Sequence, residues 1–400
     1  MFNRRQMIAS AGAAAGMALL GGTRSFAETV SLGFENGDRQ LVTYPGKRPL
    51  LRLSARPPQL ETPFAVFNDG ILTPNDAFFV RYHLADIPTE IDPATFRLDV
   101  GGKVATPLSL SLSDLKSQFE TVDLVAVHQC SGNSRGFSTP RVGGGQAGNG
   151  LMGNARWTGV SLKSVLEKAG IQDGAIEVAF DGLDGPVLAE TPDFTKSLDL
   201  EHATDGEVML AWAMNGEDLP WLNGFPLRLV VPGYYGTYWV KHLNQITVRD
   251  TTLDSFWMAK AYRIPANTCA CVDAGTKPAH TVPIARFNVR SFITNVVNGD
   301  TVAANTPLAL RGIAFDGGYG ITDVSLSADG GQTWGRAKLG EDFGKYSFRE
   351  WTITLPVAAG DVALMVRATN RIGQSQPLDA LWNPSGYMRN VVETTHVTAA

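Results

Sequence analysis

The 400-residue sequence has few of the residues that usually mark a metal or haem protein: it contains three cysteines and six histidines. It has neither the C-x-x-C-H motif that attaches c-type haem nor the H-E-x-x-H motif that binds zinc. After residue 30 it also lacks any apolar run near the roughly 18 residues of a membrane span. We therefore expect no haem on this chain and no membrane partner.

Positive charge is also scarce, because 34 Lys and Arg stand against 39 Asp and Glu, a formal net charge of −5. Nucleic-acid-binding surfaces are usually basic, so this balance argues against a nucleic-acid partner. A composition of 44% hydrophobic residues with 42 glycines and 22 prolines fits two globular domains of short strands and many turns.

Residues 1–27 are predicted to be an export signal and not part of the fold. Arg4 and Arg5 precede the apolar stretch 11–20, and Ser25-Phe26-Ala27 resembles a signal-peptidase cleavage site. The paired arginines favour the twin-arginine route over an ordinary secretory signal. Because that route carries folded proteins, the expected location is the periplasm, with any cofactor loaded before export.

Three cysteines are an odd number for an exported protein. Cys269 and Cys271 are separated by one residue, which we expect to be too close for a relaxed disulfide. At least one thiol is therefore expected to be free, and Cys130 is the candidate.

Cys130 ends an apolar run within residues 122–137 and opens into a loop that contains eight glycines between residues 131 and 154. The cysteine has three explanations. It is a buried structural thiol, a catalytic nucleophile paired with His128, or a thiolate ligand of a metal. The residues alone leave all three open.

Hydrophobic periodicity predicts few helices. Ser111 begins a short one with a capping-box pattern, and residues 162–169 present one apolar helical face between Ser161 and Gly170. Most of the remaining apolar segments are short and bounded by glycine, proline or asparagine, which is typical of strands.

Two domains are predicted after the signal. Residues 28–275 combine strands with short helices and are expected to form an α+β domain, which ends in a crossing segment of little periodicity. Residues 276–400 contain alternating strands separated by turns, a pattern typical of an all-β immunoglobulin-like sandwich.

Five segments together resemble the sulfite oxidase family of molybdenum enzymes, in order and spacing, from about residue 60 to the C-terminus. They are Phe78-Phe79-Val80-Arg81-Tyr82-His83, His128-Gln-Cys130-Ser-Gly-Asn133-Ser-Arg135, Asn154-Ala-Arg156-Trp157-Thr-Gly159, Asn223-Gly-Phe-Pro-Leu-Arg228 and Pro232-Gly…Val240-Lys241. The chain most resembles bacterial sulfite dehydrogenases, which lack the cytochrome b5 domain of animal sulfite oxidases. The resemblance implies a molybdopterin-binding domain followed by an immunoglobulin-like dimerisation domain.

The resemblance also implies the cofactor and the site residues. The cofactor is molybdenum-molybdopterin, with one molybdenum per chain bound directly by Cys130. The expected catalytic residues are Arg81, His83, Cys130, Arg135, Tyr262 and Arg389. The expected cofactor-binding residues are Phe79, Val80, Arg81, Tyr82, His83, Cys130, Asp184, Asn223, Arg228, Trp239, Val240 and Lys241.

Particular roles follow for some of these residues. Arg228 and Lys241 suit the pterin phosphate, and Asp184 suits a pterin ring N–H. The sequence departs from the family at two positions. Asn223 stands where animal enzymes have histidine, and Ala147 stands where a pocket tryptophan is expected, so the pocket is expected to be wider or shaped by another residue.

The implied function is oxidation of sulfite to sulfate by oxygen-atom transfer at a molybdenum–oxo centre, with electrons passed to a periplasmic c-type cytochrome. The implied assembly is a homodimer, or a heterodimer with a cytochrome subunit. Two alternatives are kept: a periplasmic molybdopterin enzyme that reduces methionine sulfoxide in proteins, and a non-enzymatic periplasmic binding protein. Molybdenum content separates both enzymes from the binding protein.

Overall fold

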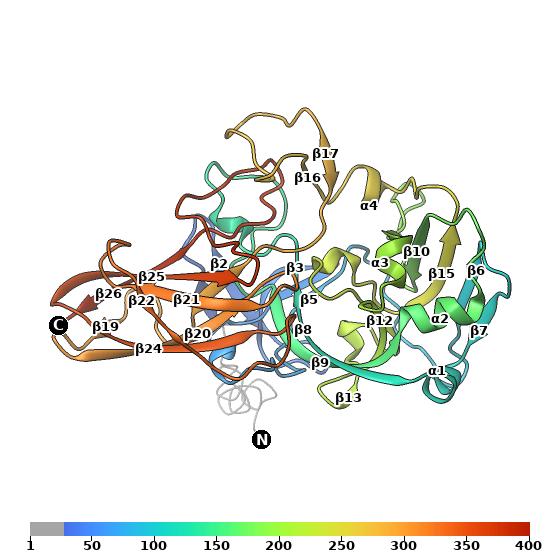
Figure 1. Ribbon diagram of the computed structural model, residues 1–400, viewed down its shortest axis with the longest axis horizontal. Helices are drawn as coiled ribbons and strands as arrows, with labels where there is room; N and C mark the ends of the chain where they lie inside the picture. The colour runs from blue at the N-terminus through green and yellow to red at the C-terminus, as the bar shows by residue number, and fades with distance from the viewer. Residues whose placement is uncertain (1–27) are drawn as a thin grey trace, which may run out of the picture.

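The computed structural model describes residues 28–400, so the predicted export signal at residues 1–27 lies outside the described residues. The described chain is mostly strand, with four short helices: α1 (Leu112–Gln118), α2 (Leu162–Ala169), α3 (Leu200–Thr204) and α4 (Phe256–Ala259). Figure 1 shows the helices at one end of the molecule and a strand-only domain at the other. Within residues 28–400, no helix is both long and apolar enough to cross a membrane.

The first sheet wraps around the middle of the molecule and ends at a predicted site residue. Its strands pair in sequence order and are β1 (Thr29–Ser31), β2 (Asp38–Val42), β3 (Leu50–Ala55), β4 (Pro58–Glu61) and β5 (Val80–Arg81). Because β5 is only two residues long, Arg81 lies in it while His83 falls in the following loop. The two side chains are therefore not held on one face of a single strand.

Two further sheets build the first domain. One has the order β11 (Lys196–Asp199), β10 (Glu177–Gly182), β15 (Leu243–Arg249), β6 (Leu98–Gly102) and β7 (Leu108–Leu110), with β15 and β6 parallel. The other has the order β13 (Glu217–Asp218), β12 (Met209–Met214), β9 (Met152–Ser161) and β8 (Thr121–Gln129), with β14 (Arg228–Val230) also paired to β12. The α+β prediction is confirmed.

The glycine-rich loop proves to be the connection of the β8–β9 hairpin. The two strands pair from Thr121 opposite Val160 to Gln129 opposite Met152, so Cys130 is the first residue beyond the ladder. The helix signals are confirmed as well. Ser111 and Asp114 form a complete capping box, and Gly170 ends α2 with φ +72°, in the left-handed region that glycine tolerates.

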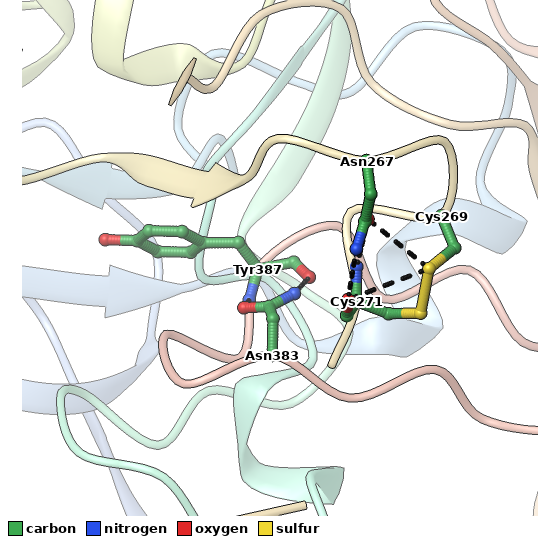
Figure 2. Close-up of a disulfide and its surroundings, with 5 residues drawn as sticks. All are labelled: Asn267, Cys269, Cys271, Asn383 and Tyr387. Atoms are coloured by element: carbon green, nitrogen blue, oxygen red, sulfur yellow. Dashed lines mark hydrogen bonds between the residues drawn. A yellow bond between two sulfur atoms is a disulfide. The ribbon is translucent and has the colours of Figure 1, made fainter. Parts of the chain in front are cut away.

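The crossing segment contains the hairpin β16 (Arg263–Pro265) and β17 (Thr281–Pro283), and the predicted boundary between residues 275 and 276 lies in its loop. In the same loop Cys269 and Cys271 form a disulfide, contrary to the sequence expectation (Figure 2). The reason is Ala270, whose φ of +49° turns the chain so that the flanking Cα atoms lie 5.1 Å apart, within the range disulfides span. Among the described cysteines only Cys130 is free.

The C-terminal domain is a sandwich of two sheets, as predicted. One sheet has the order β18 (Arg290–Ile293), β20 (Pro307–Phe315), β24 (Arg349–Pro356) and β23 (Lys338–Leu339). The other has the order β19 (Thr301–Val302), β26 (Glu393–Ala399), β25 (Gly360–Asn370), β21 (Ile321–Ser327) and β22 (Gly335–Arg336). Alternate residues such as Val324, Leu326, Leu364 and Val366 fill its core.

The hydrophobic core of the first domain extends into the C-terminal domain, which also has the separate core described above. Phe292, Phe315 and Phe348 of the sandwich belong to the same buried cluster as the core of the first domain, and the ring of Phe348 lies 6.0 Å from that of Phe67. Arg290 of β18 reinforces the contact between the domains by donating a hydrogen bond to Ser134 of the glycine-rich loop. The same guanidinium forms an ion pair with Glu393 of β26. The loop that follows Cys130 is therefore positioned in part by the sandwich.

Candidate functional site

Backbone hydrogen bonds hold Cys130 in place. Its N–H donates to the Leu151 carbonyl at 2.9 Å, and its own carbonyl accepts from the Asn133 N–H at 3.0 Å. The Asn133 side chain closes the same turn by accepting from the Leu151 N–H at 3.0 Å. The thiol is thus partly exposed on a rigid turn and does not lie in a mobile loop.

A buried carboxyl group, which the sequence reasoning missed, organises the rest of the loop. Glu61 is 1% exposed and accepts hydrogen bonds from the N–H groups of Gly148 at 3.0 Å and Gly150 at 2.8 Å. Burial raises the pKa of Glu61 to about 7, against the effect of those two hydrogen bonds. A Cβ on Gly150 would lie 2.0 Å from the Thr62 carbonyl oxygen, so this glycine serves close packing against β4 and not against a ligand.

Two cavities meet at Cys130. The first, here called the His83 cavity, is lined by Phe79, Arg81, Tyr82, His83, His128, Cys130, Ser131, Asp184, Phe194, Gly236, Thr237, Trp239, Lys241 and Tyr262. The second, here called the Arg135 cavity, is lined by Gln59, Arg81, Cys130, Gly132, Arg135, residues 143–145, Leu151, Trp257, Ala261, Tyr262, Pro384, Ser385 and Tyr387. Arg81, Cys130 and Tyr262 line both.

His83 and Tyr262 form one unit between the cavities. His83 Nε2 lies 2.6 Å from the Tyr262 hydroxyl, and the imidazole stacks on Phe194 with ring centroids 3.5 Å apart. Burial, with a smaller contribution from the charges of Arg81 and Lys196, holds the pKa of His83 well below its usual value. The imidazole is therefore neutral at pH 7, and burial likewise keeps Tyr262 protonated by raising its pKa.

Charged groups line the other side of the His83 cavity. The Lys241 ammonium lies over the Tyr82 ring, 3.4 Å from its centroid, and donates to the Leu222 carbonyl at 3.0 Å. Burial raises the pKa of Asp184 to about 6, although the charge of Lys241 opposes this rise. The Tyr82 hydroxyl is engaged at 2.7 Å with Nε2 of the buried His242.

Four buried polar atoms of the His83 cavity have no hydrogen-bond partner within residues 28–400. They are Arg81 Nη1, His128 Nδ1, Ser131 Oγ and Thr237 Oγ1. Buried polar atoms in folded proteins are nearly always hydrogen-bonded, so their grouping in one cavity marks a site that binds a polar ligand.

His128 does not act as the base of a nucleophilic cysteine. Its ring is stacked between Phe79 and Trp239, with centroid distances of 4.8 and 4.5 Å, and burial holds its pKa well below the usual value. In the described part of the chain no hydrogen bond joins His128 to Cys130. The explanation of Cys130 as a catalytic nucleophile paired with His128 therefore lacks its catalytic pair.

The Arg135 cavity takes part of its wall from the C-terminal domain. The Arg135 guanidinium lies 4.8 Å from the ring centroid of Tyr387, and its Nε donates to the Ser385 carbonyl at 2.8 Å. Tyr387 in turn stacks on Tyr262, with centroids 5.6 Å apart. Sequence reasoning missed Tyr387 because it lies more than 120 residues from Tyr262 and carries no local signal.

Several predicted residues lie outside both cavities. They are Val80, Asn223, Arg228, Val240 and Arg389. Arg228 is fully buried between Trp157 and Trp239 and donates to the carbonyls of Asn223 and Trp239. Its Nε has no partner within residues 28–400, and its expected role at the pterin phosphate stays a prediction.

Asn223, Arg389 and Ala147 also lie outside both cavities, and their expected roles stay predictions. The Asn223 side chain is 1% exposed, accepting from Lys47 at 2.6 Å and donating to the Phe79 carbonyl at 3.0 Å. Arg389, expected as a pocket cation, pairs with Glu393 at 3.6 Å and lies over Phe137. Ala147 is fully buried away from both cavities, and Trp257 of α4 provides a tryptophan in the Arg135 cavity instead.

A metal at Cys130 would not find a cluster of three protein ligand atoms in residues 28–400. Within residues 28–400 the one group of three neighbouring His, Asp, Glu or Cys ligand atoms is His202, Asp205 and Glu207, which excludes Cys130. Most ligands of a metal bound there would have to come from a cofactor or from water.

Comparison with known proteins agrees with this geometry. Residues 84–257 match the family described as the oxidoreductase molybdopterin binding domain, and residues 281–399 match the Mo-co oxidoreductase dimerisation domain. The sulfane dehydrogenase SoxCD from Paracoccus pantotrophus has the same fold, with a TM-score of 0.73 and 25% identity over 90% of each chain.

Two sulfite oxidases are similar along most of the chain. The mitochondrial enzyme of Macaca fascicularis is 35% identical over 375 residues, which cover 89% of this chain and 67% of that protein. The enzyme of Gallus gallus is 34% identical, over 86% of this chain and 77% of that protein. The chain thus spans about two thirds to three quarters of these relatives, and it belongs to the sulfite oxidase family of molybdopterin oxidoreductases.

Proposed function

We propose that this protein oxidises sulfite to sulfate and passes the electrons to a c-type cytochrome. The observation that carries the proposal is the shared wall at Cys130. There a cavity with unpartnered polar atoms meets a second cavity whose cations, Arg81 and Arg135, suit a small oxyanion.

The residues of the His83 cavity fit a molybdopterin. Cys130 offers a thiolate for the metal, while Arg81, Ser131, Thr237 and His128 offer polar atoms that lack a partner in residues 28–400. Lys241 places a buried amine beside Asp184. Burial lowers the pKa of Lys241 and the charge of Asp184 opposes this, so an anionic group such as a pterin phosphate would favour the protonated amine. When bound, molybdenum-molybdopterin supplies the oxygen-atom transfer and accepts two electrons.

The chain itself binds and orients the anion. Arg81, at the end of β5, and Arg135, in the loop between β8 and β9, both line the Arg135 cavity, where they neutralise the charge of sulfite. The neutral His83 fixes the Tyr262 hydroxyl at 2.6 Å, so the phenol keeps its proton and one defined orientation beside the reacting atoms. The aromatic walls Trp257 and Tyr387 restrict access of water to the junction.

The electron acceptor, assembly and location belong to the same proposal. The family match to a dimerisation domain supports a homodimer, with a heterodimer containing a cytochrome subunit as the alternative. The acidic balance of the chain suits a basic cytochrome. Export to the periplasm through the twin-arginine route rests on residues 4–27 of the sequence.

Sulfite-dependent reduction of ferricyanide and of cytochrome c by the molybdenum-loaded protein tests the activity. Fast sulfite turnover with about one molybdenum per chain supports the proposal, and a loaded protein that leaves sulfite unchanged contradicts it. Reduction of a methionine sulfoxide peptide is the comparison assay, because a sulfoxide reductase would reverse the order of the two rates. Light scattering after gel filtration measures the oligomeric state.

A further inference from the structure

The Cys269–Cys271 disulfide lies near Asn383 and Tyr387, and Tyr387 lines the Arg135 cavity (Figure 2). The residue after it, Val272, donates its N–H to the Trp382 carbonyl at 2.9 Å. Asn383, which follows Trp382 in the chain, holds Tyr387 in place. Its side chain donates to the Tyr387 carbonyl at 2.8 Å and accepts from the Tyr387 N–H at 3.2 Å. The disulfide loop is therefore joined to the cavity residue Tyr387 through two short hydrogen-bonded steps.

Two features make this disulfide reactive. Cys269 is exposed, so a solute can approach its sulfur. Ala270, which is buried between the two cysteines, is held at φ +49°, a conformation that is sterically disfavoured for a residue with a Cβ. Opening the disulfide releases this backbone, and exposed disulfides in such surroundings are the ones that exchange readily.

Opening is expected to stay local. The disulfide closes a loop across a sequence separation of 2, so it removes little entropy from the unfolded chain. The Asn267 side chain also holds the loop, because its Nδ2 donates to the Cys271 carbonyl at 2.8 Å and its Oδ1 accepts from the Cys271 N–H at 3.2 Å. The fold therefore does not depend on the disulfide.

The surrounding segment favours an anionic reagent. Residues 256–288 contain Lys260, Arg263, Lys277 and Arg286 but only one acidic residue, Asp273. The segment carries a formal charge of +3 (four basic residues minus one acidic residue) within a chain whose net charge is −5. Arg286 pairs with Glu207 at 3.2 Å, and the remaining excess of basic residues in the segment favours the approach of an anionic sulfur nucleophile.

We propose that the Cys269–Cys271 disulfide is a covalent modification site for sulfite. The sulfur lone pair of sulfite forms a bond to Sγ of Cys269, and the bond between the two cysteine sulfurs breaks. Cys271 leaves as a thiolate and takes a proton from water, while Cys269 becomes an S-sulfocysteine. Sulfite is oxidised and the disulfide reduced, so no further oxidant or reductant is needed.

The modification acts on the Arg135 cavity. It adds a fixed negative charge to the loop that is hydrogen-bonded, through Val272 and Trp382, to the segment that carries Tyr387 of the anion-binding cavity. This charge weakens anion binding there, so the substrate acts as a brake on its own oxidation. The role as a brake rests on the proposed function, whereas the reaction at the disulfide does not.

Peptide mapping tests the reaction. The molybdenum-loaded full chain is incubated with sulfite in the absence of an electron acceptor, and free thiols are then alkylated with a maleimide. The expected product is a peptide with a sulfonate on Cys269 and a maleimide on Cys271. Sulfate, which has no sulfur lone pair, should give neither mark, and the Cys269→Ser/Cys271→Ser variant should give neither with sulfite.

A kinetic measurement tests the consequence. After removal of excess sulfite, the modified protein should show a KM for sulfite raised several-fold with little change in kcat, and the double variant should show no change on the same treatment. The urea-unfolded chain is treated with sulfite in parallel. If sulfite opens its disulfide but leaves the native protein unmodified under the same conditions, the proposed site is wrong. An adduct without a change in KM overturns the link to Tyr387. Because the mapping needs no turnover, its result is independent of whether sulfite is the substrate.

Discussion

His83 Nε2 lies 2.6 Å from the Tyr262 hydroxyl, and this contact joins the wall of one cavity to the wall of the other. Tyr262 has φ +55°, so the backbone is held in an unfavourable conformation that directs this side chain to the junction. A residue kept in such a conformation at a cavity junction points to a role in binding or catalysis.

Replacing Tyr262 by phenylalanine is expected to lower kcat/KM for sulfite by roughly 100-fold, because it removes a fixed hydroxyl from the reacting centre. Stability should fall by only about 1–2 kcal/mol, the cost of one lost buried hydrogen bond. Steady-state kinetics and denaturant unfolding measure the two effects. Tyr319→Phe, at an exposed tyrosine of the sandwich, is the control, and equal kinetic effects in both variants would contradict the assignment.

Cys130→Ser should abolish sulfite oxidation while the chain still folds, because a serine hydroxyl is not deprotonated at neutral pH and replaces a thiolate poorly. Far-UV circular dichroism checks folding, and elemental analysis with the visible spectrum checks bound molybdenum. Turnover of this variant at the wild-type rate would show that Cys130 is not the metal ligand.

Arg135→Gln is expected to raise the KM for sulfite by about 10- to 100-fold, since a charged hydrogen bond to an anion contributes about 1.5–3 kcal/mol. The smaller effect should be on kcat, because Arg81 still reaches the junction. Arg141→Gln removes the same charge from an exposed position of the same loop and is the matched control. A similar KM in the two variants would argue against direct binding by Arg135.

Glu61 should make stability depend on pH. Its pKa is raised from 4.5 to about 7 in the folded chain, so the folded state binds this proton more tightly than the unfolded state. The contribution is therefore fully present below pH 4.5 and is lost as the pH rises through about 7. Compared with Glu61→Gln, the wild-type protein should lose up to about 3 kcal/mol of unfolding free energy across this window.

Denaturant unfolding at several pH values measures this difference. Glu120→Gln, at an exposed glutamate, should show no such dependence. A constant offset between wild type and Glu61→Gln from pH 4.5 to 7 would mean that Glu61 is already ionised in the folded protein.

Arg290→Met should destabilise the protein by about 1.5–3 kcal/mol, because it removes the 2.7 Å charged hydrogen bond to Glu393 and leaves Arg389, at 3.6 Å, as the remaining cation beside that carboxylate. It should also lower activity, since Arg290 holds Ser134 beside Arg135 through a 2.9 Å hydrogen bond. The control is Arg336→Met, whose ion pair with Asp323 is largely exposed and is expected to contribute less than about 1 kcal/mol. Equal losses in the two variants would contradict the role of Arg290.

Local sequence patterns predicted the elements well. The capping box at Ser111, the left-handed Gly170 and the alternation in β21 and β25 each depend on residues within a few positions of one another. The position of Cys130 directly after a buried strand was also readable, because an apolar run next to a glycine-rich loop has few structural solutions.

Contacts between distant segments could not be predicted in the same way. Glu61 and Tyr387 carry no local signal, yet one holds the glycine-rich loop and the other forms part of the Arg135 cavity. Arg228 and Arg389 resembled ligand-binding cations, and the structure places them outside the cavities because aromatic rings and Glu393 surround them.

The order of elements, the two-domain organisation, the family and the importance of the Cys130 thiol were all readable from the amino-acid sequence. These depend on short-range periodicity and on motifs that stay together along the chain. Only the tertiary structure decided which cations face the cavities, how Glu61 holds the loop and that Cys269 and Cys271 are bonded. Burial and side-chain direction depend on segments that are far apart in the sequence and pack together in the fold. The disulfide depends on the left-handed conformation of Ala270, which no local sequence pattern predicts.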